Sequence, residues 1–446
     1  MRARPLLAFA GVVGLVLGAC ASQPAPSRTS VPAPSRAPSA RPSSSRPASS
    51  PAPSATPDSG VTSVRLQLQW LPQAQFAGYF AAVAQGYYAA ENLAVEIIPG
   101  GPDVAPQTVG SQSDGPEFTV AWVPKVLQAR EHGSDLVDIA QVFQRSGTLS
   151  LSWVKDKITG PCQFAGKTVG VWGLGNEFEV TAAATACGLT PNLTASGDQA
   201  TRYRKVIQSD GVDPLIAKDV DVAQAMIYNE YARILETTDP TTHALYQPSD
   251  LNVINYNDYR TAMLQDAIFA RQSWLAAGND RAVAVRFVRA SLKGWIYCRD
   301  NPQDCVQYSV AAAMGAGAGA AQGSPAPGAS PVAGRSPAAS GSPAVVDSPA
   351  PGSSPVAGAG TGHQAWMLNE INALIWPSPL GIGIVDPALW ARTSTIAVGA
   401  GVLTAAPPPD AYDTSIATEA LATLSDLDTT GVTFEKGDVT ITAGGN

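Results

Sequence analysis

One short stretch of the chain crowds amide and aromatic side chains into a single loop. Residues 69–80 read Gln-Trp-Leu-Pro-Gln-Ala-Gln-Phe-Ala-Gly-Tyr-Phe, where a turn between a strand and a helix would ordinarily hold small and charged residues. Flat side chains bind the faces of an aromatic ligand, and amides bind its polar edge. The stretch therefore offers four candidate ligand-binding residues, which are Trp70, Gln73, Gln75 and Tyr79.

A glycine-containing turn offers a second group of candidates. Gly173-Leu174-Gly175 follows an apolar run and precedes a predicted helix. Glycines there let a ligand approach the backbone amides at the start of the helix. The neighbouring side chains Trp172, Asn176 and Glu177 suit a ring face and a polar edge. The alternative interpretation is a tight strand-to-helix turn without a ligand.

Two nucleotide-binding motifs match these segments incompletely. A phosphate-binding loop ending in Gly166-Lys167-Thr168 needs a glycine at residue 161 and a helix after it, but residue 161 is Pro and a strand is expected to follow. A dinucleotide fingerprint beginning at Gly173 needs a third glycine at residue 178, which is Phe. Neither site is predicted, and no cofactor is expected.

A third segment, residues 225–231, places Tyr228 and Glu230 after a predicted strand. Tyr228 is a candidate for a ring face. The Glu230 carboxylate can accept hydrogen bonds from ring N–H or amino groups. Trp122 is a further aromatic candidate, although its apolar strand favours a place in the core.

The elements around these segments predict an α/β protein. The chain alternates strands, expected at 64–70, 94–98, 118–122, 136–143 and 149–154, with helices, expected at about 77–91 and 124–131. A second unit begins with a strand at 167–172 and a helix at 176–187. Such alternation favours largely parallel sheets flanked by helices.

The first 60 residues are expected to lie outside the fold. Residues 1–19 have the basic start and short apolar run of a secretory signal, and Leu-Gly-Ala-Cys at 17–20 resembles the lipobox in which Cys20 is lipidated. Ordinary secretion without lipidation is the alternative. Residues 20–60 are nearly all Pro, Ser, Ala and Thr, which predicts a disordered stalk. The protein would then be extracytoplasmic and anchored to the bacterial cell membrane.

A similar stretch at 315–362 is predicted to be a disordered insertion, since Ser-Pro-Val-Ala-Gly at 330–334 recurs at 354–358. Roughly 340 residues are left to fold, which favours two lobes.

The charge and the cysteines exclude some functions. The chain has 28 Lys and Arg against 36 Asp and Glu, a formal charge of −8, which argues against a nucleic-acid partner. The His and Cys spacing gives no support for a metal site. In an exported protein Cys298 and Cys305 are the favoured disulfide, with free thiols as the alternative; whether Cys162 and Cys187 pair is left open.

Taken together, the motifs resemble a family of solute-binding proteins. Residues 69–80, 85–88 and 95–102, with 169–179 and 225–231, are similar to binders of the thiamine-pyrimidine-precursor and riboflavin group, which is related to aliphatic-sulfonate binders. The similarity covers roughly 64–308 and resumes near residue 363.

The resemblance implies a bilobal periplasmic-binding-protein fold with two mixed, mostly parallel sheets and a hinge. Lobe one would hold residues 61–160 and 265–446, and lobe two residues 161–264. The protein would capture a small aromatic heterocycle and deliver it to the permease and ATPase of an ABC importer. The binding residues implied are Trp70, Gln73, Gln75, Tyr79, Trp172, Asn176, Glu177, Tyr228 and Glu230.

Other functions stay open at this point. Eukaryotic relatives in this fold are enzymes that make the thiamine pyrimidine from pyridoxal phosphate and a histidine of their own chain. Here the segment 122–125, near the expected place of that histidine, has none, and no cysteine-rich iron-binding cluster is present. An enzyme is therefore not expected. A binder of another solute such as a sulfonate, and a structural lipoprotein, are the remaining alternatives. The motifs favour riboflavin slightly over a pyrimidine.

Overall fold

The computed structural model describes residues 60–192, 198–208, 211–315 and 360–446. The predicted signal peptide, Cys20, the stalk at 20–60 except its last residue, and nearly all of the predicted insertion lie outside the described residues. The predicted insertion ends two residues too late, because Thr361 and Gly362 already form the first turn of helix α11 (Thr361–Ile375). Within the described residues, no helix combines the length and apolarity needed to cross a membrane.

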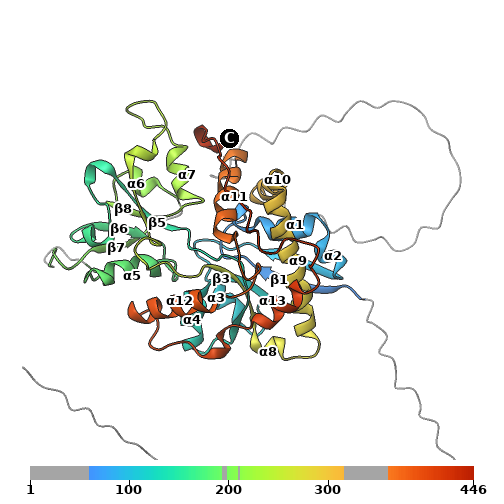
Figure 1. Cartoon of the computed structure of the whole chain (residues 1–446). Helices are drawn as coiled ribbons and strands as arrows, with labels where there is room; N and C mark the ends of the chain where they lie inside the picture. The colour runs from blue at the N-terminus through green and yellow to red at the C-terminus, as the bar shows by residue number, and fades with distance from the viewer. Residues whose placement is uncertain (1–59, 193–197, 209–210, 316–359) are drawn as a thin grey trace, which may run out of the picture. The chain divides into compact units, whose positions relative to one another are not determined.

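Two five-stranded sheets form the framework (Figure 1). The first has the order β2-β1-β3-β10-β4, with β1 at Thr62–Gln67, β2 at Leu93–Ile98, β3 at Phe118–Trp122, β4 at Leu136–Gln141 and β10 at Asp266–Arg271. The second has the order β7-β6-β8-β5-β9, with β5 at Thr148–Trp153, β6 at Thr168–Val171, β7 at Arg204–Ile207, β8 at Val222–Met226 and β9 at Leu251–Asn255. Each sheet with its covering helices is called a lobe below.

The chain crosses between the sheets twice, through residues 142–147 and 256–265. Each crossing delivers a strand that runs antiparallel to its neighbours, β5 in the second sheet and β10 in the first. The prediction of two mixed, mostly parallel sheets is confirmed, because four strands of each sheet share one direction and only β10 or β5 runs against them. The predicted boundary of lobe two at residue 161 is wrong, since β5 pairs with β8 and β9.

Helices flank both sheets. They are α1 (Ala77–Ala84), α2 (Tyr87–Ala90), α3 (Pro106–Gly110), α4 (Val123–Glu131), α5 (Phe178–Ala186), α6 (Asp213–Ile216), α7 (Glu230–Leu235), α8 (Gln272–Leu275), α9 (Asp280–Asp300), α10 (Pro302–Ala313), α12 (Pro387–Gly399) and α13 (Thr414–Leu421), besides α11. In lobe one α1 packs closely on α9 because both carry a glycine at the contact. A Cβ on Gly294 would lie 2.0 Å from the Gly78 carbonyl oxygen, so only glycine fits there.

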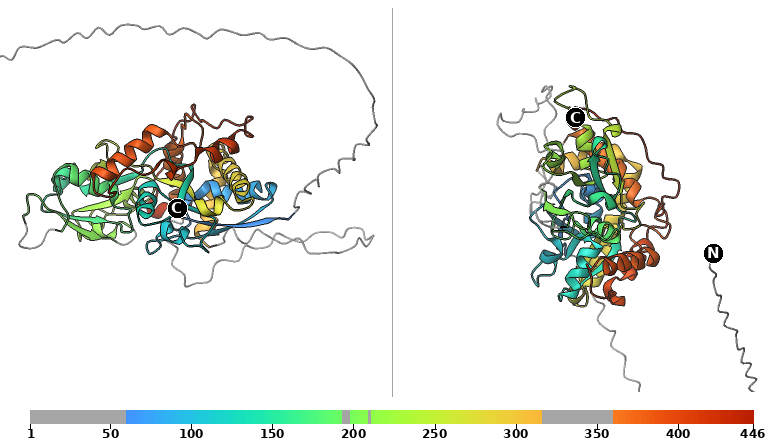
Figure 2. Two further views of the ribbon diagram at one scale, coloured as in Figure 1. Left: turned by 90° about the horizontal axis from the view of Figure 1, so that it is seen from below. Right: turned by 90° about the vertical axis from the view of Figure 1, so that its left-hand side faces the viewer.

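Two helices late in the chain contact both lobes. Helix α11 packs on α10 in lobe one and on α7 in lobe two, and α12 packs on α4 and on α5. Figure 1 shows α11 between α7 and α10, and Figure 2 gives two further views of the arrangement. The two lobes are thus held together by more than the crossing segments.

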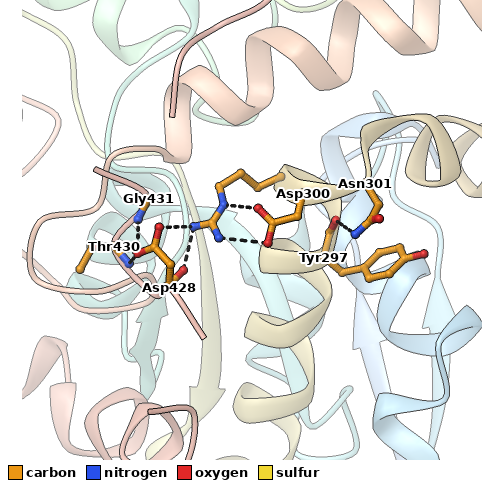
Figure 3. Close-up of polar contacts among 7 residues, drawn as sticks. Tyr297, Asp300, Asn301, Asp428, Thr430 and Gly431 are labelled. Carbon is orange, nitrogen blue, oxygen red and sulfur yellow. Dashed lines mark hydrogen bonds and ion pairs between the residues drawn. The ribbon is translucent and has the colours of Figure 1, made fainter. Parts of the chain in front are cut away.

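The last segment of the chain is fixed to α9 by one arginine. Arg299 donates to both carboxylate oxygens of Asp300 at 2.7 and 3.1 Å and to the Asp428 carbonyl oxygen at 2.7 Å. The Asp428 carboxylate in turn accepts from the backbone N–H groups of Thr430 and Gly431 (Figure 3). The guanidinium also stacks 4.6 Å from the Trp376 ring.

Two disulfides are formed. Cys298 is bonded to Cys305 across the corner between α9 and α10, and Cys162 is bonded to Cys187 at the end of α5. The first confirms the pair that the sequence favours, whereas the sequence leaves the second pairing open.

Candidate ligand-binding site

A pocket lies where the two sheets face each other. It is lined by side chains of both lobes, which are Gln69, Trp70, Gln73, Gln75, Trp122, Trp172, Asn176, Met226, Tyr228, Asn229 and Glu230. They follow the carboxyl ends of β1 and β3 in one sheet and of β6 and β8 in the other. Ligands of α/β proteins commonly bind at this edge, because the loops that leave the strands converge there. The pocket is narrow: the space that admits the centre of a water molecule is about 20 Å³.

Two tryptophans face each other across the pocket. Trp70 follows β1 in lobe one and Trp172 follows β6 in lobe two, and their ring centroids are 6.3 Å apart with the planes inclined by 55°. A ring stacked on both indoles would need them about 7–8 Å apart, twice the contact distance between carbon atoms. A small separation of the lobes would therefore create a slot for a flat ring.

Amides and one carboxylate form a chain of hydrogen bonds behind Trp70. Gln73 Nε2 donates to Gln75 Oε1 at 2.9 Å, and Gln75 Nε2 donates to Asp266 Oδ2 at 2.9 Å. Trp122 Nε1 donates to the other oxygen, Asp266 Oδ1, at 2.7 Å. Burial raises the pKa of Asp266 to about 7, although these two hydrogen bonds and the charge of Lys125 act in the opposite direction.

A second polar cluster joins the two lobes beside the pocket. Asn176 Oδ1 accepts from Gln69 Nε2 at 3.1 Å and from Lys125 Nζ at 3.1 Å, and Asn176 Nδ2 donates to the Gly173 carbonyl oxygen. Lys125 is buried, and this burial lowers the pKa of its ammonium group to about 7 against the attraction of Asp266 and Glu177. The cluster fixes the turn that carries Trp172.

A third cluster holds the far wall. The His363 ring on α11 bridges Glu236 Oε2 at 2.9 Å and Asn229 Oδ1 at 3.0 Å. Asn229 Nδ2 then donates to Glu230 Oε1 at 2.7 Å, and Glu230 Oε2 accepts from the Met226 backbone N–H at 2.8 Å. A buried contact between lobe one and lobe two thus orients the two polar residues of β8–α7 that line the pocket.

The structure brings seven of the nine predicted residues to the pocket and leaves two outside it. Tyr79 is buried in the core of lobe one, its ring edge-on to Trp295 at 5.6 Å, because α1 turns it away from the loop. Glu177 accepts from the Gly175 backbone N–H and lies 3.6 Å from Lys205 on β7. The prediction of pocket contact is wrong for these two.

Several residues of the site are not predicted from the sequence. Gln69, Met226 and Asn229 line the pocket, and Asp266 and Lys125 lie behind it. Gln69 and Asn229 are inside the motifs already singled out, so closer attention to each amide could have found them. Trp122 lines the pocket as well as the core. The described residues contain no group of three or more His, Cys, Asp or Glu residues placed to hold a metal ion.

Comparisons with known proteins agree on the fold. A protein from Bordetella bronchiseptica has a solved structure with a TM-score of 0.53 at 12% identity, covering 81% of this chain and 98% of that one. Two five-stranded α/β sheets joined by two crossings make this the periplasmic-binding-protein fold.

Two curated proteins are similar in sequence. The formylaminopyrimidine-binding protein of Halalkalibacterium halodurans is 22% identical over 251 residues, which are 56% of this chain and 70% of that protein. The riboflavin-binding protein RibY of Chloroflexus aurantiacus is 29% identical over 307 residues, which are 66% of this chain and 74% of that protein. The family model described as NMT1/THI5 like matches residues 73–305, more than half of the chain, so the chain belongs to the NMT1/THI5-like family.

Proposed function

We propose that this protein is the solute-binding component of an ABC-type importer and captures an aromatic heterocycle between its lobes. The observation that carries the proposal is the pair Trp70 and Trp172, one from each lobe, facing across a pocket lined by amides. Such a pair contacts both faces of a flat ring only when the lobes, set slightly further apart than here, enclose the ring between them. Binding and closure are therefore coupled, as expected of a hinged transport protein.

The ligand proposed is a heterocycle that contains a pyrimidine ring. Riboflavin is the first candidate, since the motif at 69–78 favours it and the relative with the higher identity is named for it. An aminopyrimidine is the second candidate. The other relative is named for such a compound. Catalysis forms no part of the proposal.

Delivery from the outer surface of the membrane completes the proposal. The protein is exported, its Cys20 is lipidated, and residues 20–60 act as a tether that lets the binding lobes reach the permease. Replacing Cys20 with Ser should abolish incorporation of labelled palmitate and release the protein into the medium. Retention of the label by the variant would contradict this part of the proposal.

The first experiment is to purify the protein, record its visible absorption spectrum and identify any small molecule released on denaturation by mass spectrometry. A bound flavin or pyrimidine supports the proposal. Trp70→Ala and Trp172→Ala should then each weaken binding measured by calorimetry. Trp274→Ala is the matched control, because Trp274 packs on Phe118 in lobe one and does not line the pocket. Unchanged binding in both pocket variants would overturn the assignment.

A further inference from the structure

The hydrogen bonds behind the pocket have a fixed direction. An indole N–H can only donate and an ionised carboxylate, the form of Asp266 above pH 7, can only accept, whereas a side-chain amide can be turned either way. Trp122 and Gln75 both donate to Asp266, one to each oxygen, at 2.7 and 2.9 Å. Asp266 is therefore the end of the chain, where two donors converge.

This end point determines how the two glutamines are turned. Gln75 must direct its NH2 group to Asp266, so its carbonyl oxygen faces Gln73. Gln73 must then direct its own NH2 group to Gln75, which leaves Gln73 Oε1 as the free acceptor end of a side chain that lines the pocket. Among the described residues none donates a hydrogen bond to Gln73 Oε1. The pocket thus presents an acceptor at this position.

The register of the first sheet explains why Asp266 stands there. Asp266 is the first residue of β10 and pairs with Trp122, the last residue of β3. Because β10 is antiparallel to β3, its start lies at the edge where the parallel strands end. The crossing segment thereby places a carboxylate beneath the loop that carries Gln73 and Gln75.

We propose that Asp266 is a positioning residue that sets the hydrogen-bond polarity of the pocket, so that the site selects heterocycles whose ring edge presents an N–H donor to Gln73. The inference rests on the proposed function and deepens it. The ligand class it names includes the imide edge of a flavin and the amino edge of an aminopyrimidine. The buried Trp172 Nε1 has no hydrogen-bond partner among the described residues, so a ligand acceptor that reaches it would satisfy this N–H.

Replacing Asp266 with Asn should reverse the chain of amides. Trp122 would keep the single oxygen of the new side chain, since its N–H can only donate, and the new NH2 group would face Gln75. Gln75 would turn its carbonyl oxygen to that group, and Gln73 would follow. Gln73 would then present NH2 instead of oxygen to the ligand, with little change in the size of any side chain.

The test measures binding of the full chain to riboflavin and to riboflavin methylated at the ring N–H, N3. Formylaminopyrimidine and its N,N-dimethylamino derivative, which has no N–H on that nitrogen, replace them if the wild type binds only the pyrimidine. All titrations are made at pH 8.5, where Asp266 is ionised. In the wild type, methylation should weaken binding about 100-fold, because the donor is lost next to an acceptor. In Asp266→Asn the ratio of the two dissociation constants, methylated over parent ligand, should fall at least about tenfold, since the variant no longer requires a donor. The bulk of the methyl group is the same in both proteins and cancels in the ratio.

A matched control and a second variant keep the result clear. Asp138→Asn makes the same change at another buried carboxyl of the first sheet, on β4 and away from the pocket, and should leave the ratio unchanged. If Asp266→Asn does not fold, Gln75→Met breaks the chain with a side chain of similar size and should lower the ratio as well. If the wild type binds the parent ligands but no variant alters the ratio, this inference alone is overturned. A folded wild type that binds neither parent ligand would overturn the proposed function as well.

Discussion

Trp172 combines two properties that a ligand can use separately. Its ring faces Trp70, and its Nε1 is buried without a hydrogen-bond partner in the described part of the chain. A buried donor without a partner costs roughly 1–3 kcal/mol. A ligand with an atom that accepts from this N–H therefore binds more tightly, in addition to the affinity it gains from stacking on the ring.

Two substitutions separate these contributions. Trp172→Phe keeps a flat face but removes the N–H, so affinity for the identified heterocycle should fall roughly three- to tenfold. Trp172→Ala removes the face as well and should cost at least about a further tenfold. Isothermal titration calorimetry measures both. Trp153→Phe is the control, because Trp153 donates to the Leu215 carbonyl oxygen away from the pocket. Equal affinities of the wild type and Trp172→Phe would show that the N–H does not contact the ligand.

Residue types in the loops were informative, whereas side-chain direction was not. The sequence predicted Trp70, Gln73 and Trp172 as binding residues, and all three line one pocket, because loops after parallel strands converge. Tyr79 was misjudged since it lies inside helix α1, where the helix phase and not the loop decides which way it points. Asp266 could not be found, because its place depends on the register of β10 against β3.

At the scale of elements, one buried carboxylate ties the two crossing segments to helix α5. Glu179 Oε2 accepts from Ser146 Oγ at 2.8 Å in the first crossing, and Glu179 Oε1 accepts from the Met263 backbone N–H at 3.2 Å in the second. Gln265 links the crossings directly, since its Oε1 accepts from the Gly147 backbone N–H at 2.9 Å. Helix α5 follows the Trp172 turn, so the two crossing segments, called the hinge below, and the pocket share one element.

The stability of this hinge should depend on pH. Burial raises the pKa of Glu179 to about 8 from an ordinary 4.5, although hydrogen bonds and the charge of Arg392 act in the opposite direction. Because the pKa of Glu179 is raised in the folded state, its contribution to stability is fully present below pH 4.5, where the carboxyl is protonated. This contribution is lost as the pH rises to about 8. Glu179→Gln does not titrate, and its amide can still accept from Met263 and donate to Ser146.

The free energy of unfolding of Glu179→Gln should therefore increase relative to that of the wild type as the pH rises from 5.5 to 8.5. The difference should grow by no more than about 1.4 kcal/mol per pH unit, to a few kcal/mol in all. Urea unfolding at several pH values measures this difference. Ser146→Ala is the control, because it weakens the same contact but keeps the carboxyl group and should retain the pH dependence. A constant difference between Glu179→Gln and the wild type across this range would contradict the expectation.

Elements were easier to predict than their membership of a lobe. The apolar runs at 136–143 and 149–154 indicated strands correctly, but both are buried on two faces and carry no signal for the sheet they join. The single helix expected at 77–91 is divided into α1 and α2 because Gly86 adopts a left-handed conformation with φ of +69°.

At the scale of the whole described fold from residue 60 onward, the last segment of the chain connects both lobes. Arg299 holds Asp428 on lobe one, and further along Ile441 packs on the core of lobe two. The Gly444 backbone N–H then donates to the Glu236 carbonyl oxygen at 3.0 Å. This contact lies beside the His363–Glu236 pair, which itself orients Asn229 in the pocket. The segment therefore helps to hold the two lobes together.

Two neighbouring glycines allow a matched test of that contact. Gly444 and Gly445 both have a positive φ, +68° and +72°, so alanine at either position carries a similar backbone cost of about 1–2 kcal/mol. A Cβ on Gly445 would also lie 2.8 Å from His363 Cβ and 2.9 Å from Glu236 Oε2, whereas a Cβ on Gly444 meets only the Asn446 side chain at 3.4 Å. Gly445→Ala should therefore push the segment away from the His363–Glu236 pair, and Gly444→Ala should not.

The expected result is ligand dissociation several-fold faster in Gly445→Ala than in Gly444→Ala, because the closed lobes lose one of their links. Stopped-flow measurement of tryptophan fluorescence gives the dissociation rates, and thermal unfolding checks that both variants are folded. The association rates should differ little, since the pocket itself is unchanged. Equal dissociation rates in the two variants would mean that the segment stabilises the fold without contributing to lobe closure.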